Sequence, residues 1–416
     1  MPGATIDHLI SATLFLVAIV LFISLFSQNI QAALLYQRNH QISVKASDLL
    51  DAISLNTGYP TYWGASSATP TSFGLQDPNA RGYHLSPFSL MRLTSSTGAP
   101  VYYPKTGLWY SNVTMAPGGF LLVPYAACVN YTTSTQLLGV NGSYGFQLTV
   151  NPILRISLTE LRASPLQIGV NVIGPGLPLA NAYVSYNLIF TDSSQKQYPI
   201  FRIYSGDART YANGSAILDF PSITGTQNAY SLIVNAHLGG LYGTGFFERQ
   251  YIDDRFIVPM VKSFDNGNGT ATILLAHSYN VPPLDKTTPA AAIFYNATFL
   301  VLATDAALHP VLIGNGTVAD KVVNGNGDPY GQILIPNTNP GILVVTFSYG
   351  NNYGISLLPW GIGNLAVSLT YGPNSSVKDW VATDVRQVVV GGVSYQIKIA
   401  LWSLAGYQVQ GSRWVF

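Results

Sequence analysis

The chain has 416 residues, a length typical of two or three domains, and only 9% of them are charged, against roughly 25% in ordinary soluble domains. The formal net charge of +1 provides no broad basic surface for a nucleic-acid backbone, so nucleic acid is not an expected partner. The single cysteine, Cys128, excludes an intramolecular disulfide and a cysteine-based metal site.

The first predicted element is a long helix over residues 1–57. Residues 9–26 are apolar except for three hydroxyl side chains, and this window is long enough to cross a hydrocarbon core of about 30 Å. Residues 4–57 contain no glycine or proline, so one unbroken helix of about 80 Å is permitted at about 1.5 Å per residue. Gly58 and Pro60 predict its end.

A secretory signal peptide is the alternative interpretation of this segment. Such a peptide needs basic residues before a shorter apolar core, and small residues at a cleavage site. Residues 1–8 contain no lysine or arginine, and the helical pattern continues beyond Phe26. These features favour a helix that stays in the mature protein.

The second half of the predicted helix is apolar on one face only. The apolar residues that form this stripe at helical spacing are Ala32, Leu35, Ile42, Ala46, Leu49 and Ile53. The first half, apolar all round, is expected to contact lipid or other helices. The second half is expected to lie on a globular domain.

The first residues of the chain indicate what kind of protein carries such a helix. It reads Gly3-Ala4-Thr5-Ile6-Asp7-His8-Leu9-Ile10-Ser11, which resembles the start of archaeal type IV pilin-like proteins. The resemblance implies that a dedicated peptidase cuts after Gly3, so that Ala4 begins the mature chain, and that the helices bundle into a filament core. It also implies assembly roles for Asp7, Leu9, Leu14, Leu16, Ile19, Phe22 and Phe26. Because a charge in an apolar bundle needs a partner, Asp7 is expected to pair with the amino terminus of a neighbour.

The rest of the chain is predicted to face the outside. Large domains are translocated largely regardless of a few flanking charges, and eight Asn-X-Ser/Thr sequons all follow the helix. Each sequon predicts a glycan attachment site if the chain meets a glycosylation system. The eight asparagines are Asn112, Asn130, Asn141, Asn213, Asn268, Asn296, Asn315 and Asn374.

Short β-branched and aromatic runs separated by Asn-Gly turns predict a body of β-sandwiches. The clearest predicted strands cover residues 167–172, 182–189, 217–220, 230–235, 256–261, 291–303, 331–335, 341–349, 365–371, 388–390 and 393–402. The expected fold class is mainly β, with a long N-terminal helix followed by immunoglobulin-like sandwiches.

The predicted body has three domains. Residues 58–150 form a β-rich domain on the helix, residues 151–255 a first sandwich, and residues 256–416 a second. A weak internal repeat indicates that the two sandwiches are similar, because residues 214–221 and residues 331–336 each precede a strand that is followed by a glycine-tyrosine cluster.

Signals for catalysis are poor. The six histidines form no metal-binding motif, and the sequence has no nucleophile elbow and no phosphate-binding loop. Asp265, in an Asn- and Gly-rich segment, is a weak calcium candidate for which a hairpin turn is the favoured interpretation. We therefore expect no enzyme activity, no cofactor and no metal.

Three functions remain in order of preference. The first is a structural subunit of a pilus-like filament on the cell surface, with glycosylated β domains outside and self-association through the helix, serving adhesion or attachment. The second is a monomeric membrane-anchored surface glycoprotein, such as an adhesin or envelope component. The third is a secreted enzyme such as a glycosidase, disfavoured by the small supply of carboxylates.

Overall fold

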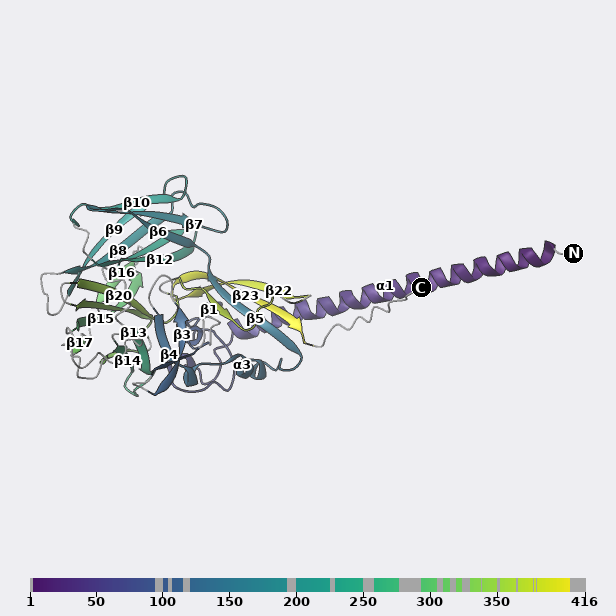
Figure 1. The fold of residues 1–416 in the computed structure, drawn as a ribbon, viewed down its shortest axis with the longest axis horizontal. Coiled ribbons are helices and arrows are strands. Elements are labelled where there is room, and N and C mark those ends of the chain that lie inside the picture. Colours follow the sequence, from purple (N-terminus) through teal and green to yellow (C-terminus); the bar gives the residue numbers. More distant parts are fainter. Residues whose placement is uncertain are drawn as a thin grey trace, which may run out of the picture.

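In the computed structural model, one long helix projects from a β-rich body (Figure 1). The structure describes residues 3–93, 100–103, 107–114, 120–192, 200–224, 229–249, 258–276, 293–304, 310–314, 319–323, 330–337, 339–349, 352–363, 366–376, 378 and 380–404. The predicted sequon at Asn315 lies outside these ranges, and the side chains of Ala4, Asn112 and Asn296 are not described.

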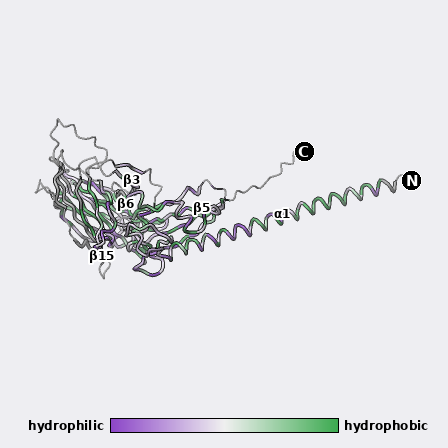
Figure 2. The backbone as a smooth tube through the Cα atoms, turned by 90° about the horizontal axis from the view of Figure 1, so that it is seen from below, coloured by the Kyte–Doolittle hydropathy of each residue, from purple (hydrophilic) through white to green (hydrophobic). Residues whose placement is uncertain are grey.

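The predicted N-terminal helix is confirmed as α1, Gly3–Ser54. Its projecting part is mostly hydrophobic, whereas the part nearest the body alternates between hydrophobic and hydrophilic residues (Figure 2). In the predicted stripe, Ile42, Ala46, Leu49 and Ile53 are buried, as is the neighbouring Leu50.

The stripe is shorter than the sequence indicated. Leu35 is 43% exposed and Ala32 is exposed, because the body first reaches the helix at Arg38, whose Nη2 donates to Ser403 Oγ at 3.4 Å. Periodicity alone does not show where the covering domain stops.

The helix ends at a turn that requires glycine. Gly58 has a φ of +75°, and a Cβ there would lie 2.7 Å from the Ser72 carbonyl oxygen. The Gly58 amide donates to Asn56 Oδ1 at 2.9 Å. The end of the helix predicted at residue 57 lies three residues beyond the observed end at Ser54.

The buried part of α1 packs against β22 and β23 of a five-stranded sheet. The order of this sheet is β1-β22-β23-β5-β21. Its strands are β1 (His84–Leu85), β5 (Tyr144–Pro152), β21 (Leu369–Tyr371), β22 (Ala382–Val390) and β23 (Val393–Ser403). Short helices precede β5 in the chain, namely η1 (Trp63–Ala65), α2 (Pro87–Met91), η2 (Tyr125–Ala127) and α3 (Tyr131–Leu137).

The first sandwich packs a three-stranded sheet, β10-β7-β6, on a four-stranded sheet, β12-β11-β8-β9. Its strands are β6 (Arg155–Ala163), β7 (Leu166–Ile173), β8 (Tyr183–Asp192), β9 (Ile200–Arg209), β10 (Ser215–Phe220), β11 (Tyr230–Leu238) and β12 (Leu241–Arg249). Alternate side chains of both sheets form a separate core that includes Ile168, Val184 and Leu232. All pairings are antiparallel, in an immunoglobulin-like order.

A second sandwich repeats this order. Its strands are β13 (Val258–Ser263), β14 (Thr270–Ala276), β15 (Ile293–Thr304), β16 (Pro310–Gly314), β17 (Ala319–Val323), β18 (Tyr330–Pro336), β19 (Gly341–Tyr349) and β20 (Asn352–Trp360). The run β18-β14-β13 corresponds to β10-β7-β6, and β20-β19-β15-β16 corresponds to β12-β11-β8-β9. The fold class is therefore mainly β, with a long N-terminal helix followed by β-sandwich domains.

Strand pairing joins two regions that the sequence predicted as separate domains, residues 58–150 and residues 256–416. β2 (Val101–Tyr103), β3 (Leu108–Thr114) and β4 (Phe120–Pro124) extend the second sandwich, because β4 pairs in parallel with β13. At the other end, β23 returns to pair with β5. Residues 58–150 and 256–416 thus share two sheets, a pairing that strand propensity cannot reveal because it locates strands and not their partners.

The buried guanidinium of Arg92 connects the segment around Trp63 to the segment around Ala127. Arg92 is 1% exposed, and its nitrogens donate to the carbonyl oxygens of Ala127, Ser66 and Ala68 at 2.6 to 3.0 Å and to that of Trp63. Its carbon Cζ lies 5.4 Å from the ring centres of Trp63 and Phe264. Burial lowers the pKa of Arg92 to about 10, so the group remains charged at neutral pH.

Candidate functional site

The candidate site is the apolar surface of the projecting part of α1. Every large apolar side chain from Ile6 to Phe26 is exposed, and no part of the most apolar window is buried in the body. Among the predicted assembly residues, exposure runs from 38% at Ile19 to 70% at Phe22. The other predicted residues on this surface are Leu9, Leu14, Leu16 and Phe26. By length and composition this helix is able to cross a membrane.

The exposed apolar surface is longer than a hydrocarbon core. Ile30, Leu34, Leu35 and Tyr36 are also exposed, at 43–76%. From Ile6 to Tyr36 the helix measures about 45 Å at about 1.5 Å per residue, against about 30 Å of bilayer hydrocarbon. An untilted lipid span therefore leaves part of this surface outside the hydrocarbon core, at the level of the head groups.

Asp7 lies at the far end of the same surface. It is exposed, within the first turns of α1, and it is followed by an apolar segment without another acidic residue until Asp48. A carboxylate among packed apolar helices requires a cationic partner. Gly3 is the first residue of α1, so the predicted cut after Gly3 falls at the start of the helix.

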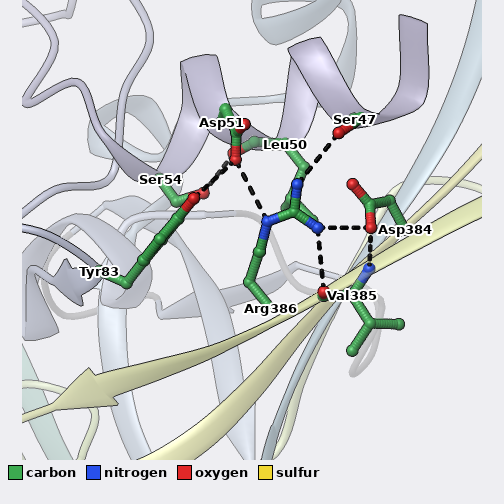
Figure 3. Close-up of polar contacts among 8 residues, drawn as sticks. All are labelled: Ser47, Leu50, Asp51, Ser54, Tyr83, Asp384, Val385 and Arg386. Carbon is green, nitrogen blue, oxygen red and sulfur yellow. Dashed lines mark hydrogen bonds and ion pairs between the residues drawn. The ribbon is translucent and has the colours of Figure 1, made fainter. Parts of the chain in front are cut away.

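A polar junction fixes the other end of the helix to the body (Figure 3). Arg386 of β22 lies between two carboxylates, with its Nε 3.3 Å from Asp51 Oδ1 and its Nη1 2.6 Å from Asp384 Oδ1. Its Nη2 donates to Ser47 Oγ at 3.0 Å, and the Tyr83 hydroxyl donates to Asp51 Oδ1 at 3.0 Å. Because Ser47 and Asp51 are one helical turn apart, one guanidinium holds a full turn of α1.

The junction affects the ionisation of Asp384. Burial acts to raise the pKa of this carboxyl, but hydrogen bonds from the Val385 amide, the Ser47 hydroxyl and Arg386, together with the charge of Arg386, lower the pKa below its usual value. Since the folded-state pKa is the lower one, this contribution to stability is present above the unfolded pKa of about 4 and is lost as the pH falls through the folded pKa.

We therefore expect Asp384→Asn to destabilise the junction at neutral pH but to have a diminishing effect below about pH 4. The measurement is the urea midpoint of the wild type and the variant between pH 7 and pH 2. Asp265→Asn, which changes an exposed acid away from the junction, is the matched control. A difference between Asp384→Asn and wild type that stays constant over this range would contradict the assigned role.

Asp265 occupies a hairpin turn between β13 and β14. Its Oδ1 accepts from the Gly267 amide at 2.8 Å, and Asn266 binds the Thr270 and Thr272 hydroxyls. Within the described ranges, no group of three or more His, Cys, Asp or Glu residues is placed to hold a metal ion. The contacts here are those of a turn whose side chains bond their own backbone.

Cys128 packs against the core at the edge of the Arg92 cluster. Burial raises the pKa of this thiol to about 11, although a hydrogen bond with Ser111 and the charge of Arg92 oppose the rise. The thiolate is the reactive form, and burial keeps this cysteine in its protonated form at neutral pH.

Five predicted sequon asparagines lie on the described surface. They are all exposed, and they are Asn130, Asn141, Asn213, Asn268 and Asn374. Asn130 precedes α3 and Asn141 follows it, whereas Asn213, Asn268 and Asn374 lie in turns next to strands. Asn112 and Asn296 lie within strands β3 and β15.

The residues that hold the helix to the body are not evident from the sequence. Tyr83, Asp384 and Arg386 are far from α1 in the sequence, and the alternation of apolar residues in β22 marks a strand without showing its partner. One signal was present, because Arg386 is a charged residue inside a strand of a chain with few charges. Such a residue often has a specific partner.

The comparisons with known proteins identify no family for this chain. No protein-family model matches it, and no curated protein matches it. Among solved structures, it is similar to a red sea bream transglutaminase at 7% identity, with 61% of this chain and 37% of that chain covered and a TM-score of 0.17. An alpha-2-macroglobulin of Escherichia coli, activated by porcine elastase, matches at 12% identity over 57% of this chain and 23% of that chain, with a TM-score of 0.21.

A mutant alpha-2-macroglobulin from Salmonella matches at 10% identity over 70% of this chain and 19% of that chain, with a TM-score of 0.20. The chain spans well under half the length of each of these proteins. Similarity at this level carries no argument about activity, and the sandwich assignment rests on the strand order described above.

Proposed function

We propose that the protein is a structural subunit of a pilus-like filament on the cell surface. The projecting halves of the α1 helices bundle into the core, and the β-rich bodies form the outer layer and serve adhesion or attachment. The observation that carries this proposal is the exposed apolar surface from Ile6 to Tyr36, which the body leaves uncovered.

Self-association covers this surface more completely than lipid alone. Each buried Leu, Ile or Phe side chain contributes about 1.5–3 kcal/mol on leaving water, and the surface extends beyond the thickness of a hydrocarbon core. Neighbouring helices that overlap along their length cover Ile30, Leu34 and Leu35 as well as the most apolar window. The resemblance of residues 3–11 to archaeal type IV pilin-like proteins supports the same arrangement.

A monomeric, membrane-anchored surface protein is the second candidate. The observation in its favour is that the most apolar window of α1 suits a single membrane span. In that case the helix stays in lipid, and residues 30–36 lie at the membrane surface.

Electron microscopy of cell-surface preparations separates the two candidates. Filaments that carry this chain, identified by an antibody against the body, support the first. Membrane-bound single particles without filaments would overturn it in favour of the second.

We expect Asp7→Ala to abolish filament assembly while the body remains folded, because a neighbour's amino terminus then loses its carboxylate partner. The measurement is the filament yield by electron microscopy, together with the thermal unfolding temperature of the body. Asp7→Glu, which keeps the charge, is the matched control and is expected to assemble. Normal filaments from Asp7→Ala would refute this role for Asp7.

A further inference from the structure

Three sequons share a turn geometry that the others do not show within the described residues. Asn213 lies between β9 and β10, Asn268 lies in the hairpin between β13 and β14, and Asn374 follows β21. All three side chains are exposed. The strands β10 and β14, which follow the first two turns, lie at opposite sides of the body (Figure 1).

The side-chain oxygen Oδ1 of each of these asparagines accepts hydrogen bonds from the residue two positions later. Asn213 Oδ1 accepts from the amide and the hydroxyl of Ser215, at 3.1 and 2.7 Å. Asn268 Oδ1 accepts from the amide and the hydroxyl of Thr270, at 3.2 and 2.6 Å. In each case the hydroxyl that completes the sequon is the group that contacts the asparagine.

The third turn has the amide contact alone. Asn374 Oδ1 accepts from the Ser376 amide at 2.9 Å. Among the hydrogen bonds described for these three side chains, all use Oδ1. The amide nitrogen Nδ2, the atom to which a glycan is joined in a sequon, therefore lies on an exposed side chain whose orientation is fixed through its other terminal atom.

We infer that Asn213, Asn268 and Asn374 carry N-linked glycans. This inference rests on the proposed placement of the body outside the cell. The glycan donor is a saccharide joined through its anomeric carbon to a lipid phosphate. Asn Nδ2 forms a bond to that carbon, the bond from the carbon to the phosphate oxygen breaks, and the lipid phosphate leaves with the electron pair while Nδ2 loses a proton.

Among the described hydrogen bonds, neither Asn130 nor Asn141 accepts from the residue that completes its own sequon, so these two sites are not part of this inference. Asn130 caps the N-terminus of α3, with Oδ1 accepting from the Thr133 amide at 2.8 Å. Asn112 and Asn296 lie in strands that pair with a neighbour on both sides.

The inferred sites also restrict how copies pack. None of the three lies on α1, so glycans there leave the helix free to bundle. Because glycans are bulky and hydrated, the turns that carry them face solvent in the assembly. The body surfaces around β10 and β14 are then outer surfaces of the filament.

The test is peptide mass spectrometry of the full chain purified from its native cells. We expect the peptides that contain Asn213, Asn268 and Asn374 to carry the added mass of a saccharide. Peptides of unmodified mass at these three positions would overturn the inference.

Matched variants show whether the sequon hydroxyl is responsible. Ser215→Ala is expected to remove the glycan from Asn213 and to leave those at Asn268 and Asn374, whereas Ser215→Thr is expected to retain all three. A glycan that persists on Asn213 in Ser215→Ala would overturn the assignment of this site. Thr270→Ala and Thr270→Ser form the corresponding pair for Asn268.

The same material distinguishes this inference from the proposed function. Filaments built from unmodified chains would overturn the glycan sites and leave the assembly proposal standing. Glycosylated chains that stay as single membrane-bound particles would support the glycan sites and overturn the filament.

Discussion

A chain that begins at residue 37 is expected to be a soluble, folded monomer that is absent from filaments and membranes. This deletion removes the exposed apolar surface, including Leu9, Leu16 and Phe22. Each of these side chains contributes about 1.5–3 kcal/mol on leaving water, so these three alone account for about 5–9 kcal/mol of driving force for association, and the other exposed apolar side chains add to it. The buried residues Ile42 and Leu50 remain, so the helix–body junction is retained.

Sedimentation velocity and cell fractionation measure this outcome. A second chain, beginning at residue 55, is the control, because it also removes Ile42, Leu49 and Ile53 from the core. It is expected to unfold or aggregate, since removing several buried aliphatic side chains costs about 2–5 kcal/mol each. If the chain that begins at residue 37 still assembled or remained bound to membranes, the apolar surface would not be the assembly site.

The local features of the fold could be predicted from the sequence. The absence of glycine and proline indicated one helix, and the observed α1 ends at Ser54. The predicted strand 341–349 matches β19, Gly341–Tyr349, and the predicted strand 393–402 differs by one residue from β23, Val393–Ser403. These features follow from neighbouring residues, so the sequence contains them directly.

The internal repeat also proved informative. The similarity between residues 214–221 and 331–336 corresponds to β10 and β18, which occupy equivalent places in the two sandwiches. Similar sequence patterns at equivalent strands arise because both strands bury alternate side chains between two sheets.

The pairing of distant strands could not be predicted. β5 and β23 pair along their length, yet each strand alone shows only alternation and β propensity. The same holds for the candidate site, whose apolar residues were evident from the sequence while the Arg386 junction that holds the helix was not. The partner of a strand depends on the tertiary packing around it, and local sequence patterns do not specify that packing.

Arg92 is the buried residue whose replacement is expected to have the largest effect on the body. Its guanidinium satisfies the carbonyl oxygens of Trp63, Ser66, Ala68 and Ala127. Arg92→Ala removes the donor from the oxygens of Ser66, Ala68 and Ala127, whereas the Trp63 oxygen keeps the Ser66 amide and hydroxyl. The substitution also opens a cavity beside Trp63. Because an unsatisfied buried polar group costs about 1–3 kcal/mol, we expect a loss of about 3–5 kcal/mol, as when one partner of a buried polar cluster is removed.

Chemical unfolding of the chain that begins at residue 37 measures this loss without interference from assembly. Arg92→Lys is the informative comparison, because lysine keeps the charge but offers three donors on one nitrogen in place of a planar fork. We expect Arg92→Lys to lose a large part of the same stability, since one ammonium cannot reach carbonyl oxygens from two separate loops. If Arg92→Lys were as stable as the wild type, charge alone would explain the role of Arg92, and the geometric account would fail.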